Sequence, residues 1–123
     1  MGSGYLSEES FAKKANALSE EVKLTKLFNE ETDRALLAER KVGSSFAIAE
    51  STAKQKTFRE KAANELTKSF NQGRTDISVL IDAMNKHYAA QIQAVKALGD
   101  YQIALNEWAA IRDELIPEKL EVP

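Results

Sequence analysis

The chain contains no proline from Met1 to Ile116, and this absence constrains the fold more than any other feature. Proline interrupts helices because it lacks a backbone N–H and clashes with the preceding turn. The same stretch is rich in alanine, glutamate, lysine and leucine, which favour helix. The sequence therefore predicts an all-α protein built from long helices.

One short stretch, NQGR at residues 71–74, interrupts this helical composition. Gly73 can adopt the positive φ that ends a helix. Thr75 follows as a candidate N-cap for a second helix, with Asp76 in its first turn. Ser7 is a similar candidate cap for the first helix. The chain is therefore expected to reverse direction at Gly73.

The predicted organisation is a long antiparallel helical hairpin, a coiled coil with unequal arms. Its parts are a helix over about 7–71, a turn over 72–74 and a helix over about 75–115, within a hairpin domain over 5–116. Residues 1–4 read as a tag or linker remnant, and 117–123 as a C-terminal tail. At about 1.5 Å per residue, the arms are roughly 100 Å and 60 Å long, so about 25 residues of the first arm lack an antiparallel partner.

Gly43, followed by two serines, is the one place where the first helix could bend. Glycine costs about 1 kcal/mol in a helix interior, and serine competes for backbone hydrogen bonds. A fold-back here would produce a three-helix bundle. No proline or loop-length insert accompanies the glycine, which favours a continuous helix.

The second predicted helix carries two series of residues with 3,4 spacing, the pattern of a coiled-coil seam. The Ile81 series comprises Ile81, Met84, Tyr88, Gln91, Val95, Leu98, Gln102 and Leu105. The Ala94 series comprises Ala94, Ala97, Tyr101, Ala104, Trp108, Ile111 and Leu115, of which all but the last form the candidate helix-packing interface. Two adjacent series predict two helical neighbours, the first arm and a helix that this chain does not supply. A single wide stripe in a three-helix core is the alternative.

Composition excludes several classes of function. The formal net charge of −2 and the pI of about 5.5 leave no basic surplus for nucleic acid or anionic lipid. The chain has no cysteine, so it forms no disulfide or thiolate metal site. Its apolar runs are far shorter than the roughly twenty residues that span a bilayer. The N-terminus lacks the pattern of a signal peptide.

No group of residues forms a recognisable catalytic, cofactor or metal site. His87 is the only histidine, and the Glu-x-x-His pair of di-iron bundles would need a glutamate where Met84 stands. A Gly-rich phosphate loop would require a preceding strand, and no strand is predicted. We therefore expect a protein that is not an enzyme and uses no cofactor.

The turn and the sequence after it resemble the second periplasmic hairpin of the outer-membrane efflux proteins, the TolC-like family. That family shows an aromatic residue before a tip glycine, an apolar run ending in Asp-Ala, and alanine-rich heptads with an Asp/Asn-Tyr pair. The corresponding residues here are Phe70, Gly73, Ile77, Leu80, Ile81, Asp82, Ala83, Ala90, Ala94, Ala97, Asp100, Tyr101 and Ala104. The stretch from Val42 to Phe46 is similar to a segment of the family's long arm.

The resemblance implies a hairpin that packs into a trimeric periplasmic tunnel of an outer-membrane channel, without direct contact with the membrane. The tip residues Gln72, Gly73, Arg74 and Thr75 would dock a periplasmic adaptor protein, also called a membrane fusion protein. Asp82 would be an acid facing the tunnel lumen, at its constriction.

Three departures from the family pattern matter. The family's membrane strands and first hairpin are absent from the sequence. Phe70 stands where some members have a tyrosine, and Val79 where some have a second acid. A stand-alone coiled-coil adaptor or scaffold protein is the alternative function.

Overall fold

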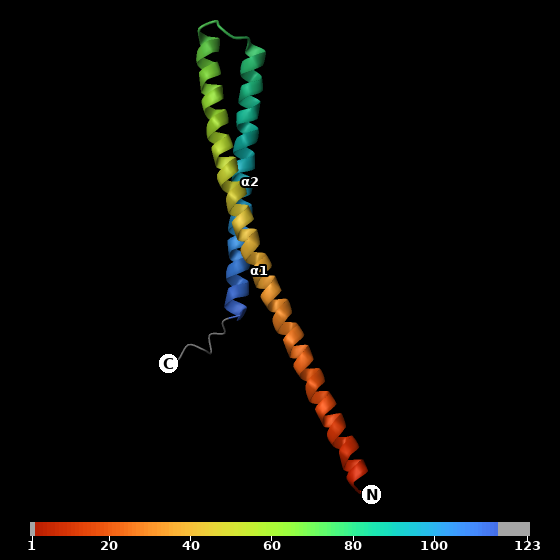
Figure 1. The fold of residues 1–123 in the computed structure, drawn as a ribbon. Helices are drawn as coiled ribbons and strands as arrows, with labels where there is room; N and C mark the ends of the chain where they lie inside the picture. The colour runs from red at the N-terminus through yellow and green to blue at the C-terminus, as the bar shows by residue number, and fades with distance from the viewer. Residues whose placement is uncertain (1, 116–123) are drawn as a thin grey trace, which may run out of the picture. The chain divides into compact units, whose positions relative to one another are not determined.

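The computed structural model describes residues 2–115, and the side chains of residues 8–115. It contains two α-helices, α1 (Gly2–Asn71) and α2 (Ile77–Leu115), which pack against each other as a hairpin (Figure 1). The predicted all-α hairpin with unequal arms is thereby confirmed. The chain divides into two compact units, one ending at Leu37 and the other beginning at Ala38, and each is described by itself.

Helix α1 continues through Gly43, so the fold-back that would give a three-helix bundle does not occur. The hydroxyl of Ser44 donates a hydrogen bond to the backbone carbonyl of Lys41, at 3.2 Å. The serine hydroxyl is therefore satisfied within its own helix, and the helix continues through this position. Nothing lies within 4 Å of the position where a Cβ at Gly43 would stand.

Both helices begin at positions that differ from those predicted. Helix α1 begins at Gly2, so Ser7 lies inside the helix rather than at its cap, and the supposed remnant is helical from Gly2 onward. Helix α2 begins at Ile77, after Asp76, whose backbone carbonyl accepts hydrogen bonds from the N–H groups of Val79 and Leu80. Asp76, rather than Thr75, thus occupies the cap position. Met1 and the predicted tail, 117–123, lie outside the described residues.

In the second unit, the two helices meet along residues that are mostly small. The buried side chains are Ala38 and Ala63 on α1, and Leu80, Ala83, Ala90, Ala97 and Ala104 on α2. The four alanines of α2 recur every seventh residue, as the heptad of a coiled coil requires. Alanine lets two helix backbones approach closely, but each buried alanine removes little apolar area from water.

Two contacts between the helices show the antiparallel register of this unit. The rings of Phe46 and Tyr101 lie with their centroids 5.5 Å apart and their planes tilted by 59°. Farther from the turn, the Lys41 ammonium lies 3.2 Å from a carboxylate oxygen of Glu107. Four of the buried alanines lie between the ring contact and the turn, and they are Ala63, Ala83, Ala90 and Ala97. Ala104 lies between the two contacts, and Ala38 lies just beyond Lys41.

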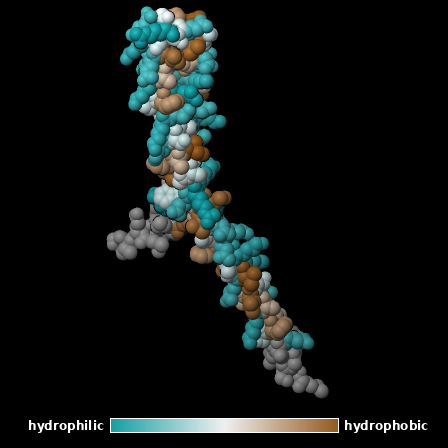
Figure 2. All heavy atoms as spheres, turned by 45° about the horizontal axis from the view of Figure 1, so that its top comes forward, coloured by the Kyte–Doolittle hydropathy of each residue, from teal (hydrophilic) through white to brown (hydrophobic). Residues whose placement is uncertain are grey.

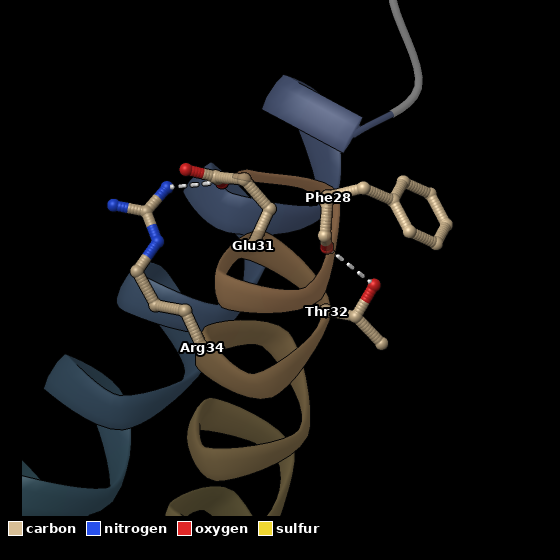
Figure 3. Close-up of polar contacts among 4 residues, drawn as sticks. All are labelled: Phe28, Glu31, Thr32 and Arg34. Atoms are coloured by element: carbon tan, nitrogen blue, oxygen red, sulfur yellow. Dashed lines mark hydrogen bonds and ion pairs between the residues drawn. The ribbon is translucent and has the colours of Figure 1, made fainter. Parts of the chain in front are cut away.

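The first unit is a stretch of α1 whose side chains from Glu8 to Glu30 are all exposed. Two contacts near its end join residues of the same helix: Arg34 pairs with Glu31 at 3.1 Å, and the Thr32 hydroxyl donates to the backbone carbonyl of Phe28 at 2.9 Å (Figure 3). The ring of Phe28 points away from its own helix. Brown, hydrophobic side chains are visible on the surface of this stretch in Figure 2.

Candidate functional site

The turn between the helices has the hydrogen bonds of a Schellman motif. The N–H of Arg74 donates to the carbonyl of Ser69 at 2.8 Å, and the N–H of Gly73 donates to the carbonyl of Phe70 at 2.9 Å. Gly73 has a φ of 72°, the left-handed conformation that this motif requires at the residue after the cap. The predicted positive φ at Gly73 is confirmed, and the tip is a defined turn.

The other predicted tip residues surround this glycine. The N–H of Gln72 donates to the carbonyl of Lys68 at 3.1 Å, which adds to the closing turn of α1. The side chains of Gln72 and Arg74 are exposed, whereas Thr75 is half-buried. The backbone of the tip is therefore held by its own hydrogen bonds, and two polar side chains remain available at its surface.

Asp82 lies on the exposed side of α2, close to the tip. Its carboxylate forms an ion pair with the Lys86 ammonium at 2.9 Å, one helical turn further on. Both side chains are more than half exposed, so water screens the pair and it contributes little to stability. Asp82 is therefore an accessible acid whose charge is partly balanced by its neighbour.

The Ala94 series faces α1. Of its members, Ala97 and Ala104 are buried, and Ala94, Tyr101, Trp108 and Ile111 are half-buried. The same 3,4 spacing continues toward the tip through Leu80, Ala83, His87 and Ala90. The guanidinium of Arg112 lies 4.9 Å from the centre of the Trp108 ring and covers one of its faces. The buried face of α2 therefore extends closer to the tip than the sequence predicted.

The matching face of α1 was not identified from the sequence. Nine of its buried or half-buried positions follow the same spacing, and they are Ala38, Val42, Ser45, Ala49, Thr52, Lys56, Arg59, Ala63 and Leu66. Ala62 and Ser69 are half-buried beside them. The Thr52 hydroxyl donates within α1, to the carbonyls of Ile48 and Ala49. The small residues at 3,4 spacing could have revealed this face in the sequence. Polar residues stand among them, however, so the face has no clear apolar periodicity.

Polar residues also occupy the middle of this interface. Lys56 and Arg59 are half-buried on α1, and His87 is half-buried on α2. The Nδ1 atom of His87 is buried and has no hydrogen-bond partner among the described residues. Its ring lies 5.6 Å from that of Tyr88. The interface between the helices is thus apolar near the tip and polar at its centre.

The Ile81 series lies mainly on the surface. Val95 is 71% exposed and Leu98 62% exposed, and Ile81 and Tyr88 are about half exposed. Ile92 and Ile103, which lie close to this series along the helix, are also exposed. Gly99 stands among these residues, and nothing lies within 4 Å of the place that a Cβ would occupy there. Helix α2 therefore has one apolar face against α1 and a second apolar face that no described residue covers.

The described residues contain no group of three or more histidines, aspartates and glutamates placed to hold a metal ion. Within residues 2–115, neither helix has a stretch long and apolar enough to cross a membrane. Among known proteins, the chain matches no family model, no curated protein and no solved structure.

Proposed function

We propose that the chain is the α-helical hairpin of a TolC-like outer-membrane efflux or secretion channel, and that it forms part of the wall of a trimeric periplasmic tunnel. The observation that carries this proposal is the pair of apolar faces on α2. A helix with two such faces is suited to a closed arrangement in which every helix has a neighbour on each side.

The small size of the hairpin's own core supports the same proposal. Its buried side chains are six alanines and one leucine, and no large side chain among the described residues is fully buried. Ordering each residue costs about 1–2 kcal/mol of conformational entropy, and buried alanines offset little of this. Further helices packed on the Ile81 series would supply the missing burial.

The tip is the surface at which a periplasmic adaptor would dock. Its Schellman turn fixes the backbone, so the exposed side chains of Gln72 and Arg74 are presented in one arrangement. Binding to a preformed turn avoids the entropy cost of ordering it. Asp82, near the tip, would contribute an acid to the tunnel constriction, with Lys86 reducing its net charge.

Substitutions on the exposed face test this proposal in the protein that carries the hairpin. Val95→Asp and Leu98→Asp should abolish trimer assembly and efflux, whereas Gln93→Asp, an exposed position outside the Ile81 series, should leave both intact. Arg74→Ala combined with Thr75→Ala should weaken adaptor binding without loss of the trimer. Normal efflux with charges at both Val95 and Leu98 would exclude the wall role.

A stand-alone coiled-coil scaffold is the second candidate function. The exposed stretch from Glu8 to Glu30 favours it, because that stretch carries apolar residues of its own. A scaffold would assemble without a membrane partner. A stable, defined oligomer of the purified chain, with no effect of Arg74→Ala on any partner, would support the scaffold over the channel wall.

A further inference from the structure

The exposed N-terminal stretch of α1 contains an apolar seam of its own. Phe11, Leu18 and Val22 are 74, 61 and 60% exposed, although all three are large apolar residues. Together with Ala15 and Thr25 they follow 4,3 spacing, so they lie on one side of the helix. Leu18, Val22 and Thr25 also line a single shallow depression of the surface. Helices in proteins derive most of their stability from packing such a face, so this seam requires a partner.

The charges that flank the seam identify the partner. With Phe11 and Leu18 at heptad position d, and Ala15 and Val22 at position a, Lys14 and Glu21 occupy the flanking g positions. Lys26 occupies a flanking e position, and Glu9 the neighbouring b position. An oppositely directed copy of the same stretch would place Lys14 beside Glu21 of the second copy, and Glu9 beside Lys26. The twofold axis repeats each pair, which gives four attractive contacts.

The sizes of the apolar residues agree with this arrangement. In an antiparallel coiled coil, a and d positions of opposite helices share each layer. Phe11 would then lie opposite Val22, and Ala15 opposite Leu18, so a larger apolar residue meets a smaller one in the central layers, and the outermost layers would pair Glu8 with Thr25. A parallel pair would place Phe11 against Phe11 and Ala15 against Ala15, and would keep only the contact between Glu21 and Lys26.

An anionic membrane surface does not fit this stretch as a partner. Its acids and lysines nearly balance, and they are Glu8, Glu9, Lys13, Lys14, Glu20, Glu21, Lys23, Lys26 and Glu30. Helices that bind such surfaces are instead rich in lysine and arginine on their polar face.

We propose that residues 8–26 of α1 form an antiparallel coiled coil with the same residues of a second copy of this chain. The proposal uses only the first unit and does not rest on the proposed function of the hairpin. An antiparallel pair runs its two copies in opposite directions, whereas copies around a threefold axis run in the same direction, so this pair would form between purified chains and not within the tunnel. It assigns this stretch as a homodimerisation site, separate from the Ile81 series on α2.

Sedimentation of the full chain, with charge-reversal variants, tests the proposal. Lys14→Glu and Glu21→Lys should each weaken the dimer by about tenfold, because attractive contacts become repulsive. The double variant restores opposite charges and should recover the original affinity. Lys13→Glu, on the outer side of the helix, is the matched control and should change little. A double variant no tighter than the single variants would overturn the antiparallel arrangement.

Two further measurements complete the test. The double variant Leu18→Asp, Val22→Asp should be a monomer. The proposal would be overturned if this variant still associated and association were lost only with Val95→Asp and Leu98→Asp.

Crosslinking reports the orientation of the two copies directly, because the chain has no native cysteine to interfere with single introduced ones. A mixture of Ala15→Cys and Leu18→Cys chains should form a mixed disulfide faster than either chain alone. Faster crosslinking of Ala15→Cys with itself would indicate a parallel pair instead.

Discussion

Phe46 of α1 and Tyr101 of α2 pack with their ring centroids 5.5 Å apart and their planes tilted by 59°. They form an aromatic contact between the two helices of the hairpin. The tilted arrangement brings the edge of one ring toward the face of the other, which is favourable for aromatic pairs. A shift of one helix by one heptad would separate these rings, so the contact favours a single register.

Removal of this contact should reveal a measurable coupling between the two rings. We expect a double-mutant cycle of Phe46→Leu and Tyr101→Leu, followed by urea unfolding, to give a coupling free energy of about 0.5–1.5 kcal/mol. The exposed pair of Lys41 and Glu107 serves as the comparison and should give less than about 1 kcal/mol. A coupling near zero for the rings would mean that they do not fix the register.

The close approach of the helices makes the buried alanines intolerant of larger side chains. Ala104, which is 1% exposed, should not accept leucine without loss of stability, and we expect Ala104→Leu to cost about 1–3 kcal/mol. Ala89→Leu, on the exposed side of the same helix, should change stability by less than about 0.5 kcal/mol. Equal effects of the two substitutions on the urea midpoint would show that Ala104 does not lie between packed helices.

Substitution of the tip glycine, Gly73, should lower the stability of the hairpin, whereas substitution of Gly43, within α1, should raise it. Gly73→Val should cost about 1–2 kcal/mol, because a β-branched residue is strained at a φ of 72°. Gly43→Ala should stabilise by about 0.5–1 kcal/mol, since alanine is the better helix former and the space around Gly43 is open. Thermal melts of both variants give the comparison. Destabilisation by Gly43→Ala would mean that another backbone approaches α1 there.

The side chain of Arg74 should matter little for folding. The hydrogen bond of this residue to Ser69 uses the backbone N–H, which a substitution retains. We therefore expect Arg74→Ala to change the free energy of unfolding by less than about 0.5 kcal/mol. A larger loss in a thermal melt would assign Arg74 a structural role and weaken the case for it as a docking residue.

The sequence was sufficient to predict the helices and the turn, because those features depend on local preferences. The missing prolines and Gly73 specify where the chain is helical and where it reverses. The sequence did not indicate which series of α2 faces α1. The Ile81 series contains no alanine, but alanines permit closer helix contact, and it is the alanine-containing face that is buried. Lys56 and Arg59 obscured the corresponding face of α1.

The N-cap residues predicted for the two helices were also wrong, because residue type is not enough to locate a cap. Thr75 and Ser7 are both suitable caps by residue type, but the position of a cap depends on the whole turn. The Schellman motif extends through Arg74, and the first helical hydrogen bonds of α2 are accepted by the carbonyl of Asp76. Residue type alone does not distinguish two adjacent cap candidates.

The rate at which single cysteines along α2 react with a thiol reagent shows directly whether this helix has one covered and one available apolar face. The chain has no native cysteine to interfere. Cysteines at Ala90, Ala97 and Ala104 should react slowly in the purified chain, and cysteines at Val95 and Leu98 should react rapidly. In the assembled protein, the last two should become slow as well. Slow reaction at Val95 and Leu98 with rapid reaction at Ala97 and Ala104 in the purified chain would be the opposite result, and would mean that α2 turns its other face toward α1.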